Sequence, residues 1–322
     1  MQCLRGLTWA HIGLCLVITS ASEPRYLRST VPTSWGEAVN LAVYEVCGNG
    51  TRGGLLIVPG FQDPVAIKYP DLLADFAARG FSPVVAYDHR GQGASTRLLR
   101  DDLYKGHVDR WTDYLDDFAT VVNDVGAPWL ACHSMGGAIC FDALTSKDIQ
   151  GVKALVAMAP MVRPVTAPFP FEVAKALGGT IVAAGLGTEY PPTRGAPAAV
   201  FWDEAILPTW TSSSRHWTDI VRRSEDSPGL RTGDADATLS LATMTVYQRL
   251  TGRPMLRVPT LIQLAGQDVW VNNDATLTYV TNGVRNPTVS WLTDAKHGMW
   301  VEREEFRTPV IDAAARWFVD RA

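Results

Sequence analysis

One serine in this chain stands where the nucleophile of an acyl-transfer reaction would be expected. Ser134 follows a short apolar run at 128–132, typical of a buried strand, and precedes apolar positions typical of a buried helix. A serine on such a strained strand-to-helix turn needs small residues two places before and after it, because larger ones would clash with the adjoining strand and helix. Gly136 meets this requirement, and Cys132 is small although it is not glycine. We therefore predict that Ser134 is a catalytic nucleophile rather than a serine of an ordinary loop.

The nucleophile requires a general base, and in proteins with this turn the chain order is serine, then acid, then histidine. Two histidines follow Ser134, His216 and His297. His297 comes after the last predicted strand, 288–292, in a loop at the sheet edge where the base belongs. His216 lies beside an arginine and a tryptophan in a segment of weaker periodicity, so we interpret it as a polar residue of that segment. The base is predicted to be His297.

The histidine must in turn be oriented by a carboxylate, which is expected at the end of the preceding strand. Asp268 lies just beyond the predicted strand 260–264. Asp274 is the alternative, but it stands where the first residues of a helix are expected. Asp294 lies only three positions before His297 and is better interpreted as a solvated loop residue. We predict that Asp268 is the acid.

The tetrahedral intermediate of acyl transfer carries an oxyanion, which needs hydrogen-bond donors aimed at it. The backbone N–H that follows the nucleophile, that of Met135, is expected to be one donor. The other is expected from the loop after the strand 55–58, where the sequence turns at Pro59-Gly60-Phe61. The backbone N–H of Phe61 is the second predicted donor.

The elements that position these residues alternate along the chain. Apolar runs predict strands at 39–46, 55–58, 84–87, 128–132, 154–158, 260–264 and 288–292, and helical spacing predicts helices at 69–79, 114–125, 138–144, 275–280 and 310–319. Strands that are apolar throughout, alternating with helices, predict a mostly parallel sheet covered on both faces. The chain is therefore predicted to have an α/β fold.

The alternation stops between about residues 163 and 252, where proline, glycine and aromatic residues are frequent. Because both flanks resemble parts of one sheet, we predict a core made of 25–162 and 253–322, with 163–252 inserted as a cap. Ligands of open α/β sheets bind at the carboxyl edge of the strands, which such an insertion would cover. A separately folded domain is the less favoured alternative.

The first residues differ from the rest of the chain. Arg5 precedes a mostly apolar run at 7–18, and small residues follow at 19–21. This arrangement predicts a secretory signal peptide at 1–21, because the run is shorter than the ~20 residues that a transmembrane helix needs. The protein is then expected to be exported, secreted or periplasmic, or held at a membrane. If the leader is not a signal peptide, a cytoplasmic location is expected.

Composition limits the possible partners. Of 322 residues, 47% are hydrophobic and 19% charged, as in a packed globular protein. The net charge is −4 with no block of Lys or Arg, so nucleic acid is not expected as a partner. Beyond the leader, Cys47, Cys132 and Cys140 lack the spacing of metal ligands. No metal and no organic cofactor is expected.

Several segments resemble the α/β-hydrolase superfamily, and within it the lysophospholipase and monoacylglycerol lipase branch. The resemblance is carried by His133-Ser134-Met135-Gly136-Gly137 at the turn and by Asp88-His89-Arg90-Gly91-Gln92-Gly93-Ala94-Ser95 after the third predicted strand. The segments Arg97-Leu98-Leu99, Gly106-His107-Val108 and Asp113-Tyr114-Leu115-Asp116-Asp117 are similar to the bacterial membrane-associated lysophospholipase type. Two departures are Pro59-Gly60 in place of the His-Gly of many lipases, and Cys132 in place of glycine or alanine.

The resemblance implies an α/β-hydrolase fold with a lid, and a serine esterase that cleaves single-chain lipids such as lysophospholipids. Monoacylglycerol lipase and general carboxylesterase are alternatives within this class, and a transacylase or a non-catalytic lipid-binding relative are alternatives outside it. The inserted segment supplies apolar side chains that could line an acyl-chain groove or touch a membrane: Phe169, Phe171, Leu177, Ile181, Val182, Leu186, Trp202, Trp210 and Trp217. About half of them are expected to form the segment's own core. The expected partners are a lipid ester and, through the cap, a membrane surface.

Overall fold

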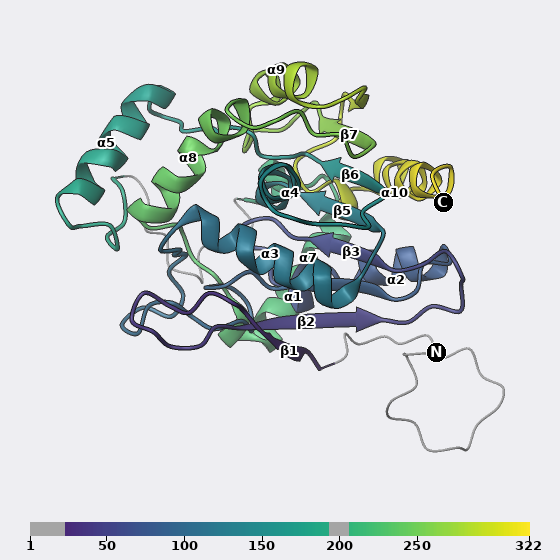
Figure 1. The fold of residues 1–322 in the computed structure, drawn as a ribbon, viewed down its shortest axis with the longest axis horizontal. Coiled ribbons are helices and arrows are strands. Elements are labelled where there is room, and N and C mark those ends of the chain that lie inside the picture. The colour runs from purple at the N-terminus through teal and green to yellow at the C-terminus, as the bar shows by residue number, and fades with distance from the viewer. Residues whose placement is uncertain (1–22, 193–205) are drawn as a thin grey trace.

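The computed structural model describes residues 23–192 and 206–322, and an eight-stranded sheet lies at its centre (Figure 1). The strands are β1 (Arg25–Arg28), β2 (Asn40–Val46), β3 (Leu55–Val58), β4 (Val84–Tyr87), β5 (Trp129–His133), β6 (Ala154–Met158), β7 (Thr260–Ala265) and β8 (Thr288–Leu292). Their order is β1-β2-β4-β3-β5-β6-β7-β8. β1 and β2 are antiparallel to each other and β2 is antiparallel to β4. The six strands β3 to β8 are all parallel to one another. The carboxyl ends of the parallel strands therefore meet at one edge.

The sheet is buried because helices cover both of its faces. The helices of the core are α1 (Val65–Lys68), α2 (Pro70–Ala78), α3 (Trp111–Val125), α4 (Met135–Ser146), α9 (Asn273–Gly283) and α10 (Glu304–Val319). Apolar residues of α3, α4 and α9 pack against one face of the sheet, and those of α1, α2 and α10 pack against the other. Every residue of β3, β4, β5 and β6 is consequently buried, which explains why these strands have no polar alternation.

Residues 163–252 lie between β6 and β7 in the chain. This segment contains α5 (Phe171–Ala183), α6 (Leu207–Trp210), α7 (Ser214–Asp226) and α8 (Ala237–Thr251). In Figure 1, α5 lies at one end of the molecule beside α8, far from α10. α8 is tied to the core because Arg249 and Arg253 bind the buried carboxylate of Asp142 in α4, at 3.0 and 2.7 Å.

The predicted α/β fold is confirmed, and every predicted strand and core helix has a counterpart. Sequence periodicity missed β1 and α1, which are only four residues long. Several helices also start earlier than predicted, with the largest differences at α3, which starts at Trp111, and α10, which starts at Glu304. The predicted signal peptide, 1–21, lies outside the described residues. None of the described helices has the length and apolar character needed to cross a bilayer.

The turn at Asp88–Ser95 after β4 is held by a buried ion pair. The Arg90 guanidinium donates to both oxygens of Asp117 in α3, at 2.6 and 2.7 Å, and to Ser29 at 3.0 Å. His89 lies 2.8 Å from the carbonyl oxygen of Pro59, at the start of the loop after β3. These contacts give the turn a structural role, since it fixes the loop from which an oxyanion donor is expected.

Candidate active site

The turn between β5 and α4 holds Ser134 in a strained conformation. Its backbone has φ 48° and ψ −120°, which residues with a side chain rarely adopt. The strain is held by hydrogen bonds from Gly137 N–H and Met161 N–H to the Ser134 carbonyl, at 2.9 and 2.8 Å. Gly136 allows the turn to press against β3, because a Cβ there would lie 2.3 Å from the Val58 carbonyl oxygen. The sequence argument for a small residue at this position therefore has a direct steric cause.

The predicted serine, acid and histidine are brought together at the carboxyl edge of the sheet. Ser134 follows β5, Asp268 follows β7 and His297 follows β8. The Nε2 atom of His297 lies 3.0 Å from the Ser134 Oγ, and its Nδ1 lies 2.6 Å from the Asp268 Oδ2. These two contacts let the imidazole accept the serine proton at one nitrogen while the carboxylate holds the N–H at the other.

The Asp268 carboxylate is well suited to orient a base. Its second oxygen accepts from the backbone N–H groups of Trp270 and Val271, at 2.8 and 3.1 Å. Burial raises the pKa of Asp268, but the His297 imidazole and the backbone donors outweigh it and lower the pKa below its usual value. The carboxylate therefore stays ionised next to the histidine.

The alternatives considered from the sequence lie elsewhere. Asp274 is in the first turn of α9, and Asp294 is an exposed loop residue. His216 lies in the first turn of α7, where its Nδ1 is 3.0 Å from the hydroxyl of Ser213. None of the three is bonded to Ser134 or His297 among the described contacts.

The two predicted oxyanion donors flank the nucleophile. The N–H of Met135 begins α4, so no carbonyl of its own helix can accept from it. Phe61 lies in the loop after β3, and it lines the same cavity as Ser134 and Met135. That loop approaches the nucleophile closely, since a Cβ on Gly60 would lie 3.0 Å from the Ser134 Cβ. Both residues therefore lie beside the cavity at the serine, and their role as oxyanion donors stays a prediction.

A buried charged cluster, Asp63, Lys68, Tyr69 and His133, lies beneath this site and was not predicted from the sequence. The Asp63 carboxylate accepts from Lys68 Nζ at 2.5 Å, from Tyr69 Oη at 3.1 Å and from the Gly60 N–H at 3.1 Å. Lys68 Nζ also lies 4.0 Å from the ring centre of Trp210. Spacing alone could not reveal the cluster, because its members come from the β3 loop, α1 and β5.

His133 connects this cluster to the loop of the base. Its Nδ1 lies 3.1 Å from Asp63 Oδ2, and its Nε2 lies 3.1 Å from the carbonyl oxygen of His297. Both neighbours are acceptors, so a proton on either nitrogen is held in a hydrogen bond. Burial lowers the pKa of His133 to about 4, although Asp63 raises it. The ring is therefore neutral near pH 7 and acts as a spacer between the oxyanion loop and the histidine loop.

The pKa values of Asp63 and Lys68 are both lowered, but for different reasons. Burial raises the pKa of Asp63, but the Lys68 ammonium and the His133 ring hold it well below its usual range. Burial also lowers the pKa of Lys68, and the Asp63 carboxylate opposes that shift. We take the pair as ionised, because the Asp63 carboxylate accepts hydrogen bonds from Lys68 Nζ, Tyr69 Oη and the Gly60 N–H.

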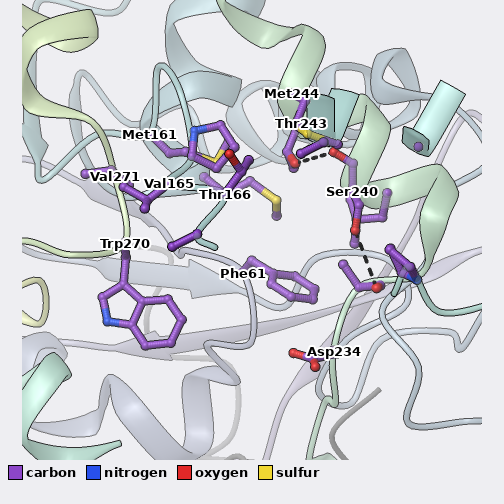
Figure 2. Close-up of a pocket in the computed structure, with 18 of the residues that line it drawn as sticks. Phe61, Met161, Val165, Thr166, Asp234, Ser240, Thr243, Met244, Trp270 and Val271 are labelled. Carbon is purple, nitrogen blue, oxygen red and sulfur yellow. Dashed lines mark hydrogen bonds between the residues drawn. The ribbon is translucent and has the colours of Figure 1, made fainter. Parts of the chain in front are cut away.

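A largely apolar cavity opens from the nucleophile toward the inserted segment. Its volume is about 190 Å³. The core contributes Phe61, Met161, Trp270 and Val271 to its wall, and the inserted segment contributes Val165, Thr166, Ser240, Thr243 and Met244 (Figure 2). Of the apolar residues expected to line a groove, Phe169, Leu177 and Trp210 do so, while Trp217 is buried in the core. Trp202 lies outside the described residues.

Metal chemistry has no evident place in the described part of the chain. Within residues 23–192 and 206–322, no three His, Cys, Asp or Glu side chains are grouped so that they could hold a metal ion. That the reaction needs no cofactor stays a prediction from the chemistry of the three side chains.

Comparisons with known proteins agree on one family of relatives. A family model described as serine aminopeptidase, S33, matches residues 49–304. A probable lysophospholipase L2 of Haemophilus influenzae is 26% identical over 270 residues, which cover 82% of each chain. Lysophospholipase L2 of Escherichia coli K12 is 46% identical over 91 residues, which are 26% of each chain.

Solved structures with the same fold include two lipases. A soluble variant of monoglyceride lipase from Saccharomyces cerevisiae superimposes with a TM-score of 0.71 at 13% identity, covering 94% of this chain and 96% of that one. The monoacylglycerol lipase of Paleococcus ferrophilus gives a TM-score of 0.66 at 17% identity, covering 87% and 99%. At such identities the likeness establishes a shared fold.

Proposed function

The chain belongs to the serine aminopeptidase S33 family of α/β hydrolases, and we propose that it hydrolyses the carboxylic ester of single-chain lipids, lysophospholipids first, through an acyl-enzyme at Ser134. The family confirms the resemblance drawn from the sequence. The observation that carries the proposal is the pair of hydrogen bonds from Asp268 through His297 to Ser134, at the mouth of an apolar cavity.

Acylation follows from the geometry. The Ser134 hydroxyl attacks the ester carbonyl while His297 Nε2, 3.0 Å away, takes the hydroxyl proton. The Asp268 carboxylate stabilises the imidazolium that forms and fixes its orientation. The oxyanion is stabilised by the backbone N–H groups of Met135 and Phe61, each donor of this kind contributing roughly 3–4 kcal/mol to the transition state. The imidazolium then protonates the leaving alcohol.

Deacylation uses the same groups in reverse. A water molecule enters where the alcohol left and gives a proton to the neutral imidazole of His297 as it attacks the acyl-enzyme. The imidazolium then gives that proton to the Ser134 Oγ as the bond between this oxygen and the acyl carbon breaks, so the fatty acid is released and Ser134 is restored. In this scheme His133 and Asp63 touch no reacting atom, and they hold the histidine loop and the oxyanion loop at a fixed separation.

The apolar cavity supports a lipid acyl chain as the acid part of the ester. Residues 163–252 act in this proposal as a cap, since they form one side of the cavity while the core forms the other. Relatives named lysophospholipase L2 favour a lysophospholipid over a monoacylglycerol, and the fold relatives named monoglyceride lipase keep the second substrate as the alternative.

Membrane contact through the cap and export from the cytoplasm belong to the same proposal. Val173 in α5 and Leu186 just after it are each 52% exposed, which suits a surface that meets lipid. Flotation of the protein with anionic and zwitterionic vesicles tests the contact, and V173K/L186K is expected to bind less. Sequencing the amino terminus of the protein recovered outside the cytoplasm tests cleavage after residue 21.

The decisive test of the reaction is a substrate panel combined with active-site labelling. We expect a fluorophosphonate probe to label the wild type and not Ser134→Ala, and lysophosphatidylcholine and monoacylglycerol to release fatty acid. A short-chain ester and an amino-acid anilide serve as controls for general esterase and aminopeptidase activity. Labelling without release of free fatty acid, but with acyl transfer to an added alcohol, would identify a transacylase. An unlabelled wild type would favour a non-catalytic lipid-binding protein.

A further inference from the structure

Two adjacent glycines in α5 have different surroundings. A Cβ on Gly178 would lie 3.4 Å from Met244 Cε and 3.8 Å from Leu241 Cβ, both in α8. A Cβ on Gly179 would have nothing within 4 Å. Gly178 is the one described residue of α5 that is buried. The first glycine therefore faces α8 and the second faces away from it.

Gly178 also lines the cavity that begins at the nucleophile. Its companions in α5 are Ala174 and Leu177, and the wall continues in α8 with Ser240, Thr243 and Met244. Figure 2 draws Thr243 and Met244 together on the α8 side of the cavity, away from Trp270. Trp270 lies on the side of the catalytic residues, because its backbone N–H donates a hydrogen bond to the Asp268 carboxylate. The α5–α8 contact therefore forms the wall of the cavity on the side away from Trp270.

Met244 is suited to be an adjustable end wall. Its side chain is unbranched and flexible, so it can occupy different positions at small cost. At present its terminal methyl fills the space in front of Gly178, only 3.4 Å from where a Cβ would stand. A Cβ alone at position 178 would be in van der Waals contact with that methyl, so a side chain longer than that of alanine must displace it. The cavity beside Met244 is the open space available to the displaced methyl.

We propose that Gly178, acting through Met244, sets the length of the acyl chain that the cavity accepts. This inference rests on the proposed function, since it concerns the depth of the same site. A side chain at position 178 moves Met244 into the cavity and shortens it, and truncation of Met244 lengthens it. The two changes therefore have opposite effects on chain-length preference.

The test compares four proteins on p-nitrophenyl esters with acyl chains of four to sixteen carbons. The proteins are the wild type, G178L, G179L and M244A, and the active fraction of each is titrated with a fluorophosphonate. G179L is the matched control, because it makes the same change in helix propensity one position away. A Cβ at position 179 would have no atom within 4 Å. The quantity measured is the ratio of kcat/KM for the longest and the shortest ester.

For G178L we expect this ratio to fall by about fourfold for each methylene that no longer fits. M244A is expected to shift the optimum toward longer chains, and G179L to keep the wild-type ratio. An equal loss at every chain length in G178L would mean displacement of α5 and would overturn the inference. The same ratio in G178L and G179L, or no shift in M244A, would also overturn it.

The proposed function and the inference fail in different ways. A wild type that is unlabelled by fluorophosphonate and hydrolyses no ester would overturn both. A wild type that hydrolyses esters but whose chain-length profile is insensitive to positions 178 and 244 would overturn only the inference. If G178L does not fold, M244A still decides, because its expected shift is in the opposite direction and creates space rather than a clash.

Discussion

The ion pair between Asp63 and Lys68 is predicted to be costly to break and much less costly to remove. Its side chains are 0% and 2% exposed, and its charged atoms are 2.5 Å apart. With an effective dielectric constant of about 20, the attraction is about 7 kcal/mol. Moving two ions out of water costs several kcal/mol for each, so the intact pair contributes little net stability. A lone charge left at this depth keeps the cost without the attraction.

Asp63→Asn is therefore expected to lower the free energy of unfolding by about 3–5 kcal/mol. Lys68→Met should cost less, because Asp63 keeps the Tyr69 hydroxyl and the Gly60 N–H as hydrogen-bond donors. The double variant removes both charges and should be more stable than Asp63→Asn alone.

Urea unfolding followed by tryptophan fluorescence measures all four proteins of this cycle at pH 7. The control is the slope of the free energy against urea, which should stay constant if the native and unfolded ensembles are unchanged. A double variant whose loss equals the sum of the two single losses would refute the reasoning, since the pair would then not be coupled.

Three further predictions concern the acid and the titrating histidines. Asp268→Asn should lower kcat by about 10⁴-fold with little change in the fold, because the tautomer of the His297 base is no longer fixed. A loss of activity below tenfold in single-turnover assays would contradict this role. Burial lowers the pKa values of His89 and His133 to about 4, so the folded state binds fewer protons than the unfolded state below pH 6.5, and stability should fall as the pH drops. Burial raises the pKa of Asp88 to about 6 and opposes this, which leaves a net loss of about 1.4 kcal/mol per pH unit between pH 6 and 4. Stability that does not fall as the pH drops from 6 to 4 would contradict a neutral His133, because the contributions of His89 and Asp88 cancel. The carboxylates of Asp109 and Asp236 outweigh burial and raise the pKa of His107 to about 9. The stability that the charged His107 contributes should therefore be lost as the pH rises from 6.5 to 9. H107Q should make the free energy of unfolding less dependent on pH in this range.

The sequence predicted those strands, helices and site residues whose signal lies in the local pattern of residues. The apolar runs of β3 to β6 and the periodicity of α4 required no knowledge of the fold, because burial on both faces selects such residues directly. Ser134 was identified by the small residues of its own turn. His297 and Asp268 followed from chain order and from their positions after strands, and the structure brings both within hydrogen-bonding distance of their partners.

The sequence did not predict the short elements β1 and α1, because neither has a local signal of its own. β1 is four residues long with three exposed, so it has no apolar pattern of its own, and its place is decided by pairing with β2. α1 is a single helical turn after Pro64, too short for a period to be read. Both are stabilised by neighbours rather than by propensity.

The cluster of Asp63, Lys68, Tyr69 and His133, and the contact of Gly178 with Met244, were decided only by tertiary structure. Each joins residues from different elements, and their meaning lies in distances that no spacing along the chain records. The sequence by itself determined which local conformations each segment prefers and which side chains can do chemistry. The packing of helices on the sheet decided which of those side chains meet, because burial, hydrogen bonding and steric fit between remote segments exist only once the chain has folded.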